Sequence, residues 1–217
     1  MTENPTWRWK VAQSLEYKWW QRYLHNKDTK EYLSWKYHYW QDLLLKLTKY
    51  IELPQSKSIL DAGCGPAGIF MALKGNSVDA IDPLLVKYDA LPHFTKDKYL
   101  WTHFQNQSIE QLNATEKYDV IYCMNAINHV ENIELCYDNL VRALKPNGYL
   151  VISTDAHKHN FLKKIFQLIP GDILHPYQFN LQEYDAFLTK QNCEIIKDIL
   201  FKEEQIFNYY ITIARKK

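Results

Sequence analysis

The segment from Ile59 to Asp82 constrains what this chain can fold into more than any other segment does. An apolar run ends at Asp61, a glycine-rich turn and a short helical pattern follow, and a second apolar run ends at Asp82. Glycines let the backbone turn tightly and approach a ligand, since they carry no Cβ. The interval from Gly63 to Asp82 is close to the roughly 20 residues that separate such a turn from an acid that binds a ribose. The pattern predicts strand, turn, helix and strand around a nucleotide-like ligand, unless the glycines only permit close packing.

The charge of the turn indicates which nucleotide it would bind. The spacing Gly63-x-Gly65-x-x-Gly68 also fits a dinucleotide, whose pyrophosphate would lie against the turn and the N-terminus of the following helix. Asp61 stands two positions before Gly63, and a carboxylate there disfavours a pyrophosphate. It suits a ligand that carries an amino group and a sulfonium. An NAD-linked oxidoreductase stays as an alternative, which Asp61 and the lack of a separate substrate domain disfavour.

This stretch resembles motif I of the class I S-adenosylmethionine (SAM) methyltransferases, whose pattern is D/E-x-G-x-G-x-G. Ala67 stands where the third glycine is usual, so a small residue is retained. The resemblance implies that Asp61, Gly63 and Gly65 border the methionine half of SAM. Asp82 would then bind the two ribose hydroxyls through charge-assisted hydrogen bonds.

Composition is typical of a small soluble enzyme. The chain has 217 residues and a net charge of +1, so no global field demands a nucleic-acid partner. No apolar run approaches the roughly 18 residues of a membrane helix, and the first ten residues lack the layout of a signal peptide. The four cysteines show no C-x-x-C spacing, which indicates neither zinc nor a disulfide framework. We expect a reduced, cytoplasmic protein of one domain.

Aromatic residues are concentrated in the first part of the chain, where six of the seven tryptophans precede residue 41. They lie on two helical patterns, at residues 11–25 and 29–51, of which Asp28 or Thr29 can cap the second and Pro54 ends it. Helical aromatics commonly form a packing surface. They could also form a lid over a flat or apolar acceptor. We therefore divide the chain into an aromatic-rich helical lid over residues 1–52 and a SAM-binding region over residues 53–217 of the same domain.

Strands and helices alternate through the rest of the chain. The predicted strands follow at 98–104, 118–125, 149–154, 194–201 and 205–214, and the predicted helices at 84–90, 133–144, 161–168 and 181–190. This alternation predicts an α/β fold with a mainly parallel sheet and helices on both faces. The resemblance implies the Rossmann-like class I methyltransferase fold, with seven strands and an antiparallel hairpin at the C-terminal end.

The polar loop after the third predicted strand, residues 104–112, is the segment that covers the adenine in the class I methyltransferases. Ser108, Ile109 and Gln107 match the positions that contact the base, although an ordinary polar loop would read the same way. The expected cofactor-binding residues are, in chain order, Asp61, Gly63, Gly65, Ala67, Asp82, Pro83, Gln107, Ser108, Ile109 and Asn125.

Residues 118–130 are similar to the fourth-strand segment of the ubiquinone-biosynthesis O-methyltransferases, and residues 171–179 fall where those enzymes have a His-containing loop. His129 and His175 are therefore our candidates for a catalytic base, since a neutral imidazole can deprotonate an acceptor hydroxyl near pH 7. Each could instead be a packed or capping histidine. Asn125 and Asn128 stand where that family has acids, so we expect no metal site.

The predicted helix near residue 165 has one apolar face with lysines beside it. Residues 158–169 could therefore contact a membrane peripherally, or the helix could simply pack on the sheet. Together the motifs predict a SAM-dependent methyltransferase that acts on a small aromatic or lipophilic acceptor, with O-methylation favoured. A non-catalytic SAM-binding protein is the other alternative.

Overall fold

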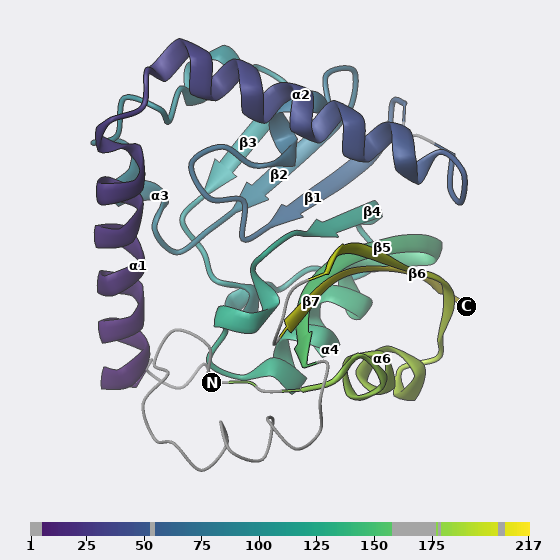
Figure 1. The fold of residues 1–217 in the computed structure, drawn as a ribbon. Coiled ribbons are helices and arrows are strands. Elements are labelled where there is room, and N and C mark those ends of the chain that lie inside the picture. Colours follow the sequence, from purple (N-terminus) through teal and green to yellow (C-terminus); the bar gives the residue numbers. More distant parts are fainter. Residues whose placement is uncertain (1–5, 53–54, 158–176, 178, 204–206) are drawn as a thin grey trace.

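A seven-stranded sheet forms the centre of the protein. The computed structural model describes residues 6–52, 55–157, 177, 179–203 and 207–217 (Figure 1). The strand order is β3-β2-β1-β4-β5-β7-β6; β1 to β5 run parallel, and β7 is antiparallel to both of its neighbours. The strands are β1 Ser58–Ala62, β2 Ser77–Ile81, β3 Thr102–Gln105, β4 Tyr118–Cys123, β5 Leu144–His157, β6 Cys193–Glu203 and β7 Phe207–Lys216. This confirms the predicted sheet and its closing hairpin.

Helices cover both faces of the sheet, as predicted. The α-helices are α1 Trp7–His25, α2 Thr29–Leu47, α3 Leu85–Tyr88, α4 Ile133–Ala143 and α6 Leu181–Lys190. One apolar cluster joins α2 and α3 to β1, β2 and β4, and the other joins α4 and α6 to the opposite face. Figure 1 shows α1 standing across the end of the sheet at which β1, β2 and β3 finish. Ligands bind at this carboxyl end in open parallel sheets.

The helix boundaries follow their capping residues. Asp28 caps α2, and its carboxylate accepts hydrogen bonds from the amides of Lys30 and Glu31, both at 2.9 Å. Thr6 caps α1 through the amide of Trp9, so α1 begins at Trp7 and not at residue 11 as predicted. The second helix ends at Leu47, four residues earlier than predicted.

The short helical pattern predicted after the glycine turn is a single 3-10 turn, η1 Ile69–Ala72. Two contacts account for this turn: the Asp61 carboxylate accepts the amide hydrogen of Phe70 at 3.0 Å, and the Trp40 indole donates to the carbonyl of Ala67 at 3.0 Å. Helix α2 thus packs against this turn.

Strand lengths were also misjudged. β3 begins at Thr102 because a 3-10 turn, η2 Lys96–Lys98, occupies the start of the predicted strand. β5 extends to His157 because it pairs with β7 from Tyr149 to His157. The predicted helix at 161–168 lies outside the described residues, as does the segment 158–169 that we considered for membrane contact. No helix in the described part of the chain combines the length and apolarity of a membrane span.

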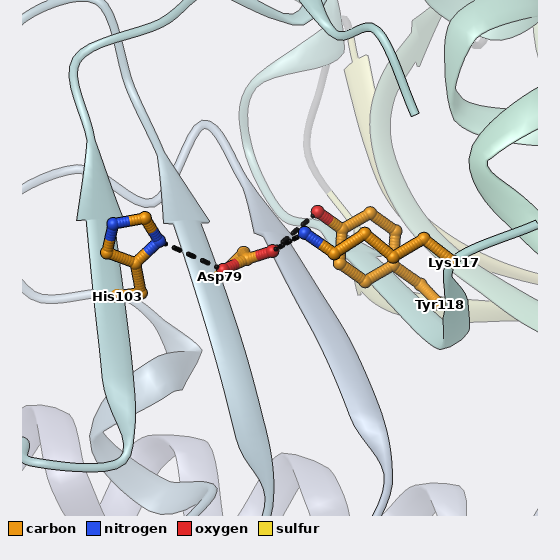
Figure 2. Close-up of polar contacts among 4 residues, drawn as sticks. All are labelled: Asp79, His103, Lys117 and Tyr118. Carbon is orange, nitrogen blue, oxygen red and sulfur yellow. Dashed lines mark hydrogen bonds and ion pairs between the residues drawn. The ribbon is translucent and has the colours of Figure 1, made fainter. Parts of the chain in front are cut away.

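A polar cluster links β2 to its neighbour β3 and, across β1, to the start of β4 (Figure 2). Asp79 on β2 accepts hydrogen bonds from the ammonium of Lys117 at 2.6 Å, the hydroxyl of Tyr118 at 2.7 Å and Nδ1 of His103 at 3.3 Å. Burial acts to raise the pKa of Asp79, but these three donors outweigh it and the pKa is lowered. The cluster therefore holds an ionised carboxylate in the scaffold.

Candidate functional site

A cavity of about 420 Å³ opens at the carboxyl ends of the parallel strands. Its walls come from α1, α2 and the segments that follow β1, β2, β3 and β4. Nine residues predicted for the site line it: Gly63, Gly65, Ala67, Asp82, Pro83, Ser108, Ile109, Asn125 and His129. Asp61 and Gln107 are not part of the lining, and His175 lies outside the described residues. The fold thus brings together predicted site residues that are up to 66 positions apart in the sequence, from Gly63 to His129.

The glycine turn needs its glycines for backbone and space. Gly63 has φ +73°, and a Cβ added there would lie 2.3 Å from Cβ of Ala126. Gly65 has φ +57°, a conformation that L side chains rarely adopt. A Cβ on Gly68 would lie 2.5 Å from a carboxylate oxygen of Asp61. The turn therefore leaves its backbone open to the cavity while Asp61 supports it from the protein interior.

Asp82 follows β2 and lies on the cavity wall, 6% exposed. One carboxylate oxygen accepts the amide hydrogen of Gly65 at 3.0 Å and the other that of Leu84 at 2.8 Å. Burial raises the pKa of Asp82 to about 6, although these two hydrogen bonds act to lower it. Each oxygen keeps a further lone pair, so the carboxylate can accept hydrogen bonds from a ligand in the cavity.

The two N-terminal helices contribute charged residues that we did not predict from the sequence. Lys36 on α2 is the single lysine or arginine among the described lining residues, and its ammonium lies 4.5 Å from the ring centroid of Trp40. Burial lowers the pKa of Lys36 to about 8, and the charge of Asp61 opposes this shift. The spacing of Lys36 and Trp40, one helical turn apart, is a signal that could have pointed to this wall.

Glu16 on α1 is the second charged residue of the cavity that we did not predict from the sequence. Burial raises the pKa of Glu16 to about 8; the charge of Asp82 adds to the shift, and a hydrogen bond with Trp20 opposes it. Burial likewise raises the pKa of Asp61, to about 7, and the Phe70 amide opposes the rise. The cofactor half of the site therefore has three carboxyl groups with raised pKa values and one lysine.

The opposite wall is held by a short hydrogen-bonded chain. The amide of Asn125, which has φ +58°, donates to the hydroxyl of Ser153 at 2.7 Å, and the hydroxyl of Tyr209 donates to the same oxygen at 2.7 Å. This chain fixes the turn after β4 that leads into η4, Ile127–His129. His129 is half-buried and reaches the cavity together with Asp155.

The segment after β3, which we predicted to border an adenine, is held by hydrogen bonds from the protein interior. The side chain of Gln111 accepts the amide hydrogen of Ser108 at 3.1 Å, and the side chain of Asn139 donates to the carbonyl of Ile109 at 3.0 Å. Within the described residues no group of three or more His, Cys, Asp or Glu side chains is placed to hold a metal ion. Asn128 is buried, and its amide donates to the carbonyl of Asp155 at 3.4 Å.

Comparison with known proteins places the chain in a family. Residues 32–197 match a family model described as a methyltransferase domain. The ubiquinone biosynthesis O-methyltransferase of Rickettsia canadensis is 33% identical over 153 residues, which is 67% of this chain. That match spans 62% of the relative's own length, less than two thirds.

Solved structures show the same fold. Magnesium protoporphyrin IX methyltransferase from Synechocystis PCC 6803, solved with bound S-adenosylhomocysteine, is 19% identical with a TM-score of 0.67, covering 96% of this chain and 97% of that one. A putative sarcosine dimethylglycine methyltransferase from Galdieria sulphuraria is 15% identical with a TM-score of 0.70, covering 95% and 98%. Together with the family match over more than half of the sequence and the strand order described above, these findings show that the chain belongs to the class I SAM-dependent methyltransferases.

Proposed function

We propose that the cavity binds SAM and that the chain transfers the SAM methyl group to a small aromatic or lipophilic acceptor, with an oxygen atom favoured. The observation that carries this proposal is the position of Asp82, which lies on the cavity wall beside the open glycine turn with both oxygens held by backbone amides. A neutral or cationic ligand suits this wall better than a phosphate, because the carboxyl groups outnumber the single lysine.

The residues present fit the cofactor. Gly63 and Gly65 line the cavity and have no side chains, so they would offer bare backbone to the methionine half. Lys36 is placed to neutralise the carboxylate of that half, and Asp82 to accept the ribose hydroxyls. Ser108, Ile109 and Pro83 line the cavity and would border the adenine. Gln107 does not line the cavity and would have to move to contact the adenine.

Bound SAM supplies an electrophilic methyl group on a sulfonium. The protein must place the acceptor oxygen in line with that methyl group and exclude water, which accounts for much of the acceleration. A hydroxyl acceptor would have to lose its proton on receiving the methyl group, so the site would need a base beside the acceptor oxygen. His129 is our first candidate for this base because it lines the cavity, and His175 stays the second.

The walls favour an apolar, flat acceptor. The two N-terminal helices contribute five aromatic side chains to the lining: Trp9, Trp19, Trp20, Tyr39 and Trp40. This supports the proposal that residues 1–52 form a lid over the region 53–217. All four cysteines are buried and unpaired, which supports the proposed cytoplasmic location.

The test is a transfer assay with methyl-labelled SAM against catechols, simple phenols and primary amines, with products identified by mass spectrometry. We expect methylated phenolic oxygens and matching amounts of S-adenosylhomocysteine. Methylation of amines alone would overturn the preference for oxygen. Binding of SAM without transfer to any acceptor would favour a non-catalytic SAM-binding protein.

A further inference from the structure

One face of α1 forms a wall of the cofactor cavity. Trp9, Gln13, Glu16 and Trp20 recur every three or four residues and all line the cavity. Glu16 is the one acidic residue of α1, whereas the basic residues of this helix, such as Arg22, are exposed. The acid of α1 is therefore turned toward the cavity and not toward solvent.

Oxygen-bearing side chains from three elements converge beside the glycine turn. Glu16 of α1 is close enough to Asp82 for their charges to interact, and Tyr88 of α3 interacts with both. The ring of Trp20 lies 3.6 Å from the point where a Cβ of Gly65 would stand, with its centroid 6.4 Å from that of Tyr88. The convergence is therefore located directly over the turn that is proposed to bind the cofactor.

Few hydrogen-bond donors face the two acids of this cluster, and the one side-chain hydrogen bond of Glu16 that we find is with Trp20. The Tyr88 side chain is fully buried, and its hydroxyl makes no hydrogen bond within the described residues. Asp82 receives only the two backbone amides, and the charge of Glu16 faces that of Asp82. Two adjacent carboxylates are unfavourable unless donors are placed between them. A vicinal diol supplies two hydroxyl donors and no charge, whereas a phosphate would be repelled.

We propose that Glu16 and Asp82 share the two ribose hydroxyls of the bound cofactor, so that α1 closes on the nucleoside and forms part of its binding site. This inference rests on the proposed function. It makes Glu16 a positioning residue of the cofactor site, supplied by a helix that lies outside the matched methyltransferase region, which begins at residue 32.

The groups that titrate around Glu16 are Asp82 at the end of β2, Tyr88 on α3, Cys64 of the glycine turn and Lys36 on α2. In the free protein Glu16 is protonated over much of the neutral range, because its pKa is raised to about 8. A ribose hydroxyl that donates to Glu16 favours the ionised carboxylate. Cofactor binding at pH 7 should therefore release a proton from Glu16.

The experiment titrates S-adenosylhomocysteine into the full chain and into Glu16→Ala, Glu16→Gln and Glu194→Ala. Glu194 is an exposed acid on β6 and serves as the matched control. We expect Glu16→Ala to weaken binding roughly 10-fold or more, the scale of a lost hydrogen bond to a charged group, and the control to leave it unchanged. Calorimetry at pH 7 in buffers of different ionisation enthalpy should show proton release in the wild type and less in Glu16→Gln.

The outcomes separate the possible failures. If Glu16→Ala binds like the wild type, or if Glu16→Gln releases as many protons, the sharing of the ribose is wrong while the proposed function stands. If the wild type itself does not bind S-adenosylhomocysteine, the proposed function fails. A purely structural Glu16 would lower the melting temperature of the free protein when replaced, whereas we expect Glu16→Gln at pH 8 to melt at the same temperature or higher.

Discussion

Two aspartates of the same region, Asp79 on β2 and Asp82 just beyond its end, have opposite environments. Asp79 receives hydrogen bonds from a histidine on β3 and from a lysine and a tyrosine at the start of β4 (Figure 2), and its pKa is lowered. Asp82 receives only two backbone amides, and burial raises its pKa to about 6. Asp79 and Asp82 are thus only three positions apart, but the Asp79 carboxylate already accepts three side-chain hydrogen bonds, whereas the Asp82 carboxylate can still accept hydrogen bonds from a ligand.

The difference distinguishes the scaffold from the site. An acid surrounded by donors stabilises the folded state in its ionised form, whereas a buried acid with few donors costs stability near neutral pH. Clusters of perturbed acids of the second kind are common at functional sites. We therefore expect substitutions at the two positions to affect different properties.

The largest effect should come from the catalytic side of the cavity. His129→Ala should lower kcat by roughly 10²–10⁴-fold with a hydroxyl acceptor, because the acceptor proton then has no base. Affinity for S-adenosylhomocysteine should barely change. Steady-state kinetics with the acceptor found in the transfer assay measures both. Normal turnover in His129→Ala and also in His175→Ala would show that neither histidine is the base.

Asp82→Asn should come next and should act on cofactor affinity. The loss of charged hydrogen bonds to the ribose predicts a weakening of about 2 kcal/mol or more, measured by calorimetry with S-adenosylhomocysteine. The free protein at pH 7.5 should not lose stability in urea. A destabilised variant with unchanged affinity would place Asp82 in the scaffold and erase the contrast with Asp79.

Asp79→Asn should show the reverse pattern. Replacing the carboxylate weakens its three side-chain hydrogen bonds, so the free energy of unfolding should fall by about 1–3 kcal/mol in urea titrations at pH 7.5. Cofactor affinity should stay at the wild-type value. A loss of binding without a loss of stability would contradict this assignment.

The pH dependence of stability should also differ between the two variants. The pKa of Asp79 is lowered on folding, so its contribution is present above the usual value near 4 and is lost as the pH falls below it. The pKa of Asp82 is raised to about 6, so its contribution is present at low pH and is lost between about pH 4 and 6 as the pH rises. Urea titrations across this range should therefore show that the lower free energy of unfolding of Asp79→Asn approaches the wild-type value at low pH. The free energy of unfolding of Asp82→Asn should instead rise relative to that of the wild type as the pH rises. Parallel curves would refute the assigned shifts.

The smallest effect expected is that of chelation. Asn125 and Asn128 offer only neutral amide groups, which bind a hard divalent cation less well than carboxylates do, so turnover should survive EDTA nearly unchanged. An activity that is lost in EDTA and restored by magnesium would show that the region around these asparagines, or residues beyond the described ones, holds a metal.

Sequence reasoning succeeded where the signal was local. The glycine turn, Asp82 and the alternation of strands and helices are each contained in short segments, and the structure confirms the resulting fold. It failed where distant contacts decide. Strand β5 is long because β7 pairs with it.

The residues of the site divide in the same way. Those on the strand ends could be predicted because motif spacing places them at one edge of the sheet. Glu16 and Lys36 were not predicted, because the aromatic pattern that indicated a lid does not say which charged side chains of these helices face the cavity.

The most direct test of the central claim, that the cavity at Asp82 binds SAM, is a pair of calorimetric titrations of the wild-type chain with S-adenosylhomocysteine and with NAD. We predict saturable binding of S-adenosylhomocysteine and much weaker binding of NAD, because the carboxyl-rich wall disfavours a pyrophosphate. Tighter binding of NAD than of S-adenosylhomocysteine would contradict the account.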